Sequence, residues 1–561
     1  MLSFVQSLAP EAKHSRLLGA SVLLGVTVGV VVSLFEYITV AGVLERITHQ
    51  GLLVQTLAPL VGLALTAIIL AKLGNNATNS TSDEYIAAYH MRHPTLPPAK
   101  LPARLLAGVT TIGFGGALGL EGPSIYTGSV FGLETAKRLD RWLGRGSAKL
   151  LLTAGAAAGV AAVFQAPATG VLFALEAPYR DDLAHRALLP SLVASASAYL
   201  TFISMPLNHP EPLLGQVFGR PLQASDLVAA LAIGLGAGLG GRMYAALVRR
   251  TKQLSKQTSP AVRVVVGGTA LSLLALLSVQ LFDQPLTLGP GVSVVEWLAE
   301  DQTLQAVAII FVLRIAATMT TILGGGTGGL FIPLAVQGVL LGKLVGLGLS
   351  DLGVDPNGSA LLPVLGLAAF LAAGYRTPIA AVMFVAESTA NSGSAVVPAL
   401  IAAAVSQLVA GPHSVSAGQR VERLGHLEER LTMPLAAALT TDVLTVPPDA
   451  TVSEFVWIHA LGRRERVVPV VDGNTYLGLC SVESCAQIER DDWETTTVAE
   501  VLEATDHTAN PGWSLRDVVT AMEANHSTVM AVTDGERNFI GVVLESEIVK
   551  LGEILDETGN L

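Results

Sequence analysis

The sequence predicts an all-α polytopic membrane domain with internally repeated, broken helices, followed by a smaller α/β domain. The chain has 561 residues, a mean hydropathy of +0.55 and only 14% charged residues, whereas soluble domains carry about 25%. It also has 56 glycines, and small residues let membrane helices pack closely. Finally, matching Gly/Pro interruptions occur in the two halves of the apolar region.

Charge separates the chain into two parts. Residues 433–561 hold 22 acidic and 7 basic residues, whereas the preceding residues hold 23 and 27. We therefore expect a transmembrane domain over 1–411, a polar, helix-compatible linker over 412–432 and an acidic cytoplasmic domain over 433–561. Neither part predicts a nucleic-acid partner. The two cysteines, Cys480 and Cys485, are too few for a disulfide framework and indicate a reducing compartment.

The apolar part predicts several spanning helices. A spanning helix needs about 20 residues, and the clearest runs are Leu17–Leu44, Leu52–Leu73, Ala187–Phe202, Leu227–Val248, Val262–Leu281, Leu304–Leu323 and Val396–Ala410. The first run is too long for a secretory signal. Lys13 and Arg16 precede it, which predicts a cytoplasmic N-terminus.

Shorter apolar runs are interrupted by Gly and Pro, and the interruptions repeat. Gly119–Pro123 corresponds to Gly329–Pro333 at an offset of 210, and Phe164–Pro167 corresponds to Tyr375–Pro378 at an offset of 211. These matches predict two repeats, roughly 15–205 and 225–411. Paired interruptions of this kind indicate a transport site at the repeat interface. The relative orientation of the repeats stays open at this point.

The first interruption predicts an anion site. Pro123 lies in the first turn of a helix, and a helix N-terminus presents unpaired N–H groups and partial positive charge. The anion is either a dissolved ion or the carboxylate of Glu121. An acidic residue inside a membrane is costly unless it has a function, and a purely structural cap is the alternative.

The second interruption predicts a matching helix start at Phe331, with amides near Phe331 and Ile332 facing the anion. The glycines of 324–329 also spell GxGxxG, but the apolar flanks do not fit a dinucleotide fold. A third, polar interruption, Asn75–Asp83, contains Ser80-x-x-Asp83 and reads as a helix cap.

The acidic domain contains two similar units, each a strand, a helix and two strands joined by an acidic Gly turn. The expected elements are Val443–Pro447, Val452–Leu461 and Val467–Val471 in the first unit, and Thr508–Pro511, Leu515–Ala524 and Thr528–Val532 in the second.

Together these motifs resemble the CLC chloride channels and chloride/proton exchangers. The resemblance rests on GLEGP at 119–123, GGLFIP at 328–333, the 150–176 run and a tail similar to tandem cystathionine-synthase-type (CBS) domains. It implies a homodimer with one pathway per subunit, built from inverted repeats, that carries chloride and similar anions and, in exchangers, protons.

The resemblance assigns roles to individual residues. Glu121 matches the gating glutamate, and Phe331 and Ile332 match residues whose amides hold the central anion. Ser80 matches the central-site serine by its spacing to Glu121, although its surroundings differ from the family pattern. The other expected anion-binding residues are Gly119, Leu120 and Gly122.

Two departures from the family bear on mechanism. Val415 falls at the central tyrosine position, and Ala177 falls where exchangers carry a second, proton-transferring glutamate. Neighbouring Glu176 reads as structural, as its repeat partner Glu387 suggests. The main hypothesis is therefore chloride transport through a glutamate-gated pathway by a passive channel or a weakly proton-coupled carrier. The alternative is a fully coupled chloride/proton antiporter.

Charged Glu121 competes with the anion for one helix end, so we expect transport to rise with acidity. The remaining expectations are a plasma-membrane location with both termini cytoplasmic, and no required cofactor or metal. The CBS resemblance suggests that the tail binds an adenine nucleotide, but neither tail unit keeps the Asp that usually binds the ribose. A nucleotide-sensing transporter of another solute is a less favoured class. An enzyme is not expected, because HExxH, serine-elbow and Walker A patterns are missing from the sequence.

Overall fold

A computed structural model describes residues 2–91, 93–143, 146–207, 224–351, 361–389, 395–421, 431–503, 507–525 and 527–558. The chain forms two compact units, residues 1–423 and 424–561, which are considered separately. The division falls inside the predicted 412–432 linker. Residues 412–421 of that linker are irregular instead of helical, and 422–430 lie outside the described residues.

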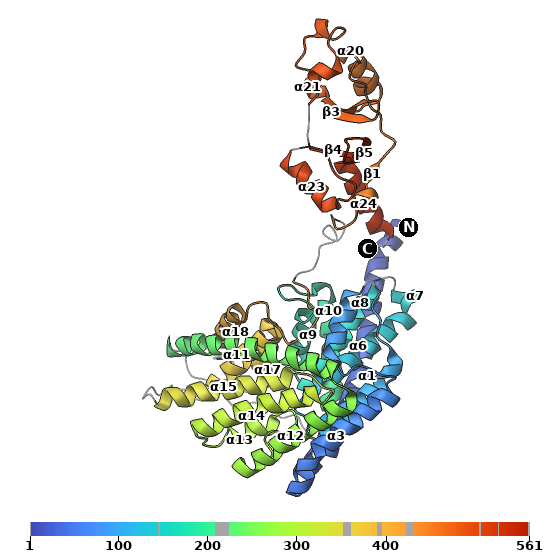
Figure 1. Ribbon diagram of the computed structural model, residues 1–561. Coiled ribbons are helices and arrows are strands. Elements are labelled where there is room, and N and C mark those ends of the chain that lie inside the picture. Colours follow the sequence, from blue (N-terminus) through green and yellow to red (C-terminus); the bar gives the residue numbers. More distant parts are fainter. Residues whose placement is uncertain are drawn as a thin grey trace. The chain divides into compact units, whose positions relative to one another are not determined.

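The regular elements of the first unit are helices throughout its described residues (Figure 1). Its first half contains α1 (Leu2–Thr39), α2 (Glu45–Thr48), α3 (Leu52–Lys72), α4 (Ser82–His90), α5 (Leu101–Gly113), α6 (Glu121–Arg138), α7 (Asp140–Leu143), α8 (Ser147–Phe164), α9 (Pro167–Glu176) and α10 (Leu188–Ser204). Its second half contains α11 (Ala224–Gln257), α12 (Pro260–Phe282), α13 (Val292–Trp297), α14 (Leu304–Leu323), α15 (Phe331–Asp351), α16 (Leu361–Tyr375), α17 (Pro378–Ser388) and α18 (Val396–Ala410).

Eight of the described helical segments are long and apolar enough to cross a membrane. They cover Ser15–Thr48, Leu52–Lys72, Ser147–Phe164, His185–Ser204, Ser225–Gln257, Pro260–Phe282, Leu304–Leu323 and Phe331–Asp351. Shorter apolar helices, including α9, α16, α17 and α18, complete the unit. The predicted polytopic membrane domain with broken helices is confirmed.

Proline fixes where several of these helices begin. Pro167, Pro260 and Pro378 each occupy the first helical position, where the missing N–H costs no hydrogen bond and the fixed φ favours the helix. Because Pro167 and Pro378 stand at equivalent places in the two repeats, α9 and α17 start at matching points.

The two repeats meet about an approximate two-fold axis. Gly119 and its repeat equivalent Gly329 exchange both backbone hydrogen bonds, at 2.9 and 2.7 Å, in an antiparallel bridge. Glu176 accepts from the amides of Ile379 and Ala380 at 3.1 and 2.7 Å. Its equivalent Glu387 accepts in return from the start of α9, through the Ala168 and Thr169 amides at 2.8 and 2.7 Å. Reciprocal contacts of this kind are the signature of a two-fold relation, as inverted repeats require.

Glycines bring equivalent helices together in both repeats. A Cβ on Gly128 of α6 would lie 1.9 Å from the Gly155 carbonyl oxygen of α8. A Cβ on Gly338 of α15 would lie 2.3 Å from the Gly366 carbonyl oxygen of α16. Only glycine permits backbones this close. In each repeat, therefore, a glycine-to-glycine contact packs the broken helix against its partner helix.

The second unit contains two antiparallel sheets, β1–β5–β4 and β2–β3. The strands are β1 (Leu439–Thr440), β2 (Val467–Asp472), β3 (Thr475–Ser481), β4 (Val529–Thr533) and β5 (Phe539–Leu544). The helices are α20 (Val452–Glu454), which continues as a π-helix over Phe455–Gly462, α21 (Val482–Cys485), α22 (Val498–Val501), α23 (Leu515–Ala524) and α24 (Glu545–Thr558). The predicted α/β tail of two similar units is confirmed.

The expected first strand of each tail unit is reduced to a single bridge. Val446 pairs with Val470, and Ala509 pairs with Val532, both in parallel. Prolines 447, 448 and 511 follow these residues. Proline has no N–H to donate, so it ends the ladder at that point.

Candidate anion-binding site

Glu121 is the first residue of α6 and lies fully buried where the two repeats meet. The Phe331 N–H, at the start of α15, donates to its Oε1 at 2.5 Å, and Ile332 is the next residue of that helix. A Cβ on Gly119 or Gly329 would fall 1.9 or 2.2 Å from a carboxylate oxygen. The two matching glycines are therefore what admits this side chain between the repeats.

The remaining predicted residues of the first interruption also line this place. Leu120 forms the N-cap of α6, and its carbonyl accepts from the Ser124 amide at 3.2 Å. Gly122 faces the other repeat, because a Cβ there would lie 2.9 Å from the Gly328 carbonyl carbon. Two helix N-termini, those of α6 and α15, thus converge on one buried carboxylate, and both favour negative charge.

An aromatic cluster surrounds the Phe331 ring. Phe164 and its repeat equivalent Tyr375 lie with ring centroids 4.3 and 6.2 Å from it. Phe173 and its equivalent Phe384 lie 5.4 and 5.1 Å away, both edge-on. Four rings in two repeat-related pairs therefore fix the residue whose amide holds Glu121, and they remove water from its surroundings.

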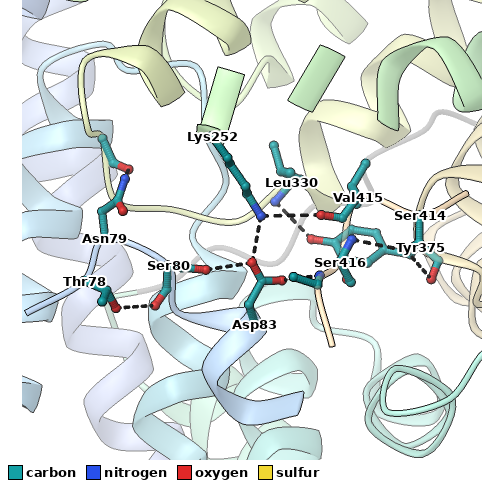
Figure 2. Close-up of polar contacts among 12 residues, drawn as sticks. Thr78, Asn79, Ser80, Asp83, Lys252, Leu330, Tyr375, Ser414, Val415 and Ser416 are labelled. Atoms are coloured by element: carbon teal, nitrogen blue, oxygen red, sulfur yellow. Dashed lines mark hydrogen bonds and ion pairs between the residues drawn. The ribbon is translucent and has the colours of Figure 1, made fainter. Parts of the chain in front are cut away.

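A polar network includes two residues singled out by the sequence (Figure 2). The Ser80 hydroxyl donates to Asp83 Oδ2 at 2.9 Å, and Lys252 Nζ contacts the same oxygen at 2.7 Å. The Val415 carbonyl accepts from Lys252 at 3.4 Å. The Ala417 amide donates to Asp83 Oδ1 at 3.0 Å. Ser80 is therefore directed toward an ion pair, and the Val415 side chain is buried without a hydroxyl.

Two hydroxyl residues that the sequence reasoning did not single out lie beside the site. The hydroxyl of Tyr375, the last residue of α16, accepts a hydrogen bond from the Leu330 amide at 3.2 Å. Leu330 directly precedes Phe331, whose amide holds Glu121. Thr81 is buried against Gly122. The repeat match of Phe164 with Tyr375 could have indicated the tyrosine. The threonine could have been found because Thr81 directly follows Ser80 in the sequence.

Position 177 is alanine, as the sequence shows, and the neighbouring Glu176 acts as a helix cap. The Ala177 side chain is buried, and its carbonyl accepts from the Gln419 side chain at 2.9 Å. The Glu176 carboxylate caps the start of α17 through two backbone amides. This contact supports the structural interpretation of Glu176.

Two arginines are fully buried within the described part of the chain, and both have partners there. Arg104 pairs with Glu84 and lies 4.1 Å from the Tyr126 ring centroid. Arg314 donates to the carbonyls of Gly289 and Pro290 at 3.0 and 2.7 Å. Both guanidinium groups therefore have their own partners, and the hydrogen bond that Glu121 accepts comes from a backbone amide instead.

Broken helices, a two-fold repeat and paired helix ends at one buried carboxylate define a polytopic membrane protein of the ion-transport class. A family model described as the voltage gated chloride channel matches residues 61–411. The chain therefore belongs to this family, the CLC proteins, which transport anions. A CBS-domain model matches residues 498–553, which covers most of the second tail unit.

Curated relatives include both transporters and channels. The H(+)/Cl(-) exchange transporter ClcA of Salmonella paratyphi A is 26% identical over 364 residues, covering 62% of this chain and 75% of that protein. The voltage-gated ClC-type chloride channel ClcB of Escherichia coli O9:H4 is 30% identical over 292 residues, covering 51% and 66%. Both descriptions agree with the expectation that the chain is not an enzyme.

Solved structures share the fold. A slow cyanobacterial Cl-/H+ antiporter superposes with a TM-score of 0.63 at 22% identity, covering 70% of this chain and 94% of that one. A eukaryotic CLC transporter gives 0.62 at 17% identity and covers 95% and 98%.

Proposed function

We propose that this protein moves chloride across a membrane in exchange for protons, with Glu121 as the group that couples the two. The observation that carries the proposal is the hydrogen bond from the Phe331 N–H to Glu121 Oε1, at 2.5 Å. The charged carboxylate occupies the helix end that an anion needs. An anion can take this place only when Glu121 leaves it.

Protonation is the simplest way to release Glu121. A neutral carboxyl group loses its attraction to the positive helix end, and a bound anion repels only the charged form. Each anion that enters therefore favours the uptake of a proton, and each proton favours the entry of an anion. Glu121 thus links the two ions, because its charged form competes with the anion and its protonated form does not, and this linkage predicts that transport rises as the medium becomes more acidic.

Similarity supports the exchanger over the channel that the sequence favoured. ClcA is an exchange transporter by its description, and its match covers more of this chain than the ClcB match does. A passive chloride channel is the second candidate. The observations that favour it are Ala177 at the proton-glutamate position and Val415 at the central tyrosine position.

The test uses the full chain in proteoliposomes loaded with chloride and a pH-sensitive dye. We expect a chloride gradient to drive protons uphill in the wild type. In Glu121→Ala we expect chloride flux to continue and proton movement to stop. Glu134→Gln is the matched control, because Glu134 lies on the same helix and pairs with the exposed Arg138, at 4.0 Å; it should behave as the wild type does.

Each other result points to a different function. Fast chloride flux with no proton movement in the wild type would establish the channel. Proton movement that persists in Glu121→Ala would remove Glu121 from the coupling. Loss of chloride flux in every protein, including the wild type, would indicate another solute.

Assembly and location complete the proposal. We propose a homodimer with one pathway per subunit in a plasma membrane, with both termini in the cytoplasm; Lys13 and Arg16 before the first span support this orientation. Adenine-nucleotide binding by the tail is retained as a weaker proposal. The CBS resemblance places the ribose of the first unit at residues 478–484. The Ser481 hydroxyl of this segment already donates to Glu503 at 3.1 Å, which counts against nucleotide binding.

A further inference from the structure

The side-chain hydroxyls expected at the anion site are directed elsewhere or missing. The Ser80 hydroxyl donates to Asp83 at 2.9 Å, and the Lys252 ammonium group holds the same carboxylate oxygen at 2.7 Å (Figure 2). Position 415 is valine. A charge-assisted network of this kind is stronger than a neutral hydrogen bond, so Ser80 is held toward Asp83.

Thr81, one residue further on, lies at the place that Ser80 does not reach. It is the N-cap of α4 and is 1% exposed. Its position is fixed by Gly122, where a Cβ would lie 2.5 Å from Thr81 Oγ1 and 2.9 Å from the Gly328 carbonyl carbon. The hydroxyl is therefore next to the first turn of α6 and to the segment that leads into α15.

The Thr81 hydroxyl has no hydrogen-bond partner within the part of the chain that the structure describes. N-cap residues normally use the side-chain oxygen to accept from the helix, but Thr81 makes no such bond to α4. A buried hydroxyl without a partner is unfavourable. A ligand that accepts a hydrogen bond would remove this cost.

Tyr375 places a second hydroxyl at the start of α15. It is 3% exposed, and its oxygen accepts the Leu330 N–H at 3.2 Å. A tyrosine hydroxyl that accepts in this way still has its own proton to donate. Phe173 packs edge-on against the ring at 5.3 Å, so the donor is held in one place beside the α15 amides.

We propose that Thr81 and Tyr375 supply the side-chain hydroxyl donors that bind a small anion between the N-termini of α6 and α15. The inference rests on the proposed anion transport and specifies the residues of that site. Two neutral donors bind an anion without a buried cation, so the ion can leave again. Tyr375, at the end of α16, also takes over the role of the hydroxyl that Val415 lacks.

The test measures chloride affinity by isothermal titration of the purified full chain, together with the chloride-to-nitrate flux ratio in proteoliposomes. We expect Thr81→Val and Tyr375→Phe each to lower chloride affinity about tenfold, as loss of one good hydrogen bond to an ion does. Both changes should alter the flux ratio. Thr81→Ser keeps the hydroxyl and should restore both values. Thr127→Val is the matched control, because its buried hydroxyl is satisfied by the Pro123 carbonyl at 2.7 Å.

Ser80→Ala is the deciding comparison. A larger loss of affinity in Ser80→Ala than in Thr81→Val would overturn the assignment of Thr81. Unchanged affinity in Tyr375→Phe, which keeps the ring and its packing, would overturn that of Tyr375, and this variant also serves if Thr81→Val does not fold. A wild type that neither binds nor transports chloride would refute the proposed function itself; normal transport with unaffected variants would refute only this inference.

Discussion

The reciprocal caps made by Glu176 and Glu387 allow a prediction that separates structure from proton transfer. Glutamine at either position keeps the shape of the side chain but removes its charge and one acceptor oxygen. Glu387 accepts two amides and the Thr169 hydroxyl, all at 2.7–2.8 Å. Glu176 accepts two amides.

The magnitude follows from these contacts. A hydrogen bond to a charged group is worth about 1.5–3 kcal/mol, and an unpaired buried N–H costs about 1–3 kcal/mol. Each glutamine leaves at least one amide facing its own NH₂ group. We therefore expect Glu387→Gln and Glu176→Gln each to reduce the free energy of unfolding by about 2–4 kcal/mol, with Glu387→Gln the more damaging.

The assay combines stability with coupling. Thermal unfolding of the detergent-solubilised protein, followed by the folded fraction on size exclusion, measures the first effect. Proton and chloride fluxes of the surviving folded protein measure the second. Because both acids act as caps, we expect the proton-to-chloride ratio to stay at its wild-type value in both variants. Altered proton coupling in Glu176→Gln alone would refute this reasoning and place Glu176 on a proton path.

Two further predictions concern packing and the tail. Gly128→Ala would place a Cβ 1.9 Å from a backbone oxygen of α8, so we expect loss of folded protein on size exclusion. Gly348→Ala, with no atom within 4 Å, should fold normally and gain up to about 1 kcal/mol of helix propensity. In the tail, hydrogen bonds from Ser514 lower the pKa of Asp517, and this stabilisation is lost as the pH falls through that lowered value. Asp517→Asn should therefore speed hydrogen exchange of α23 at neutral pH, and the difference from wild type should narrow below about pH 4; a difference that does not depend on pH would contradict the cap.

The backbone of the site was predictable from sequence because its chemistry is carried by glycine and proline. Gly119, Gly329 and Pro123 mark where helices stop and start, and these breaks are visible at a fixed spacing. The two-fold relation between the repeats could not be derived from the residues themselves, and only the family resemblance implied it. It depends on contacts such as Glu176 with Ile379, which join residues that are about 200 positions apart.

The side chains of the site were harder to predict than its backbone. Spacing to Glu121 selects Ser80, but the direction of its hydroxyl is set by Asp83 and by Lys252, which lies on a helix of the other repeat. No local pattern around Ser80 indicates that Asp83 has a partner 169 residues away. The same limit applies to Tyr375, whose hydroxyl reaches the α15 amides only through packing of α16 against α15.

These differences indicate which parts of an anion site can change. Phe331 contributes an amide, which every residue except proline possesses, so substitution leaves the donor in place. A hydroxyl donor such as that of Tyr375 depends only on reaching the anion and can come from any neighbouring helix. Loss of the hydroxyl at Val415 therefore need not abolish anion binding. Loss of the helix breaks would abolish it, because they aim the amides of two repeats at one point.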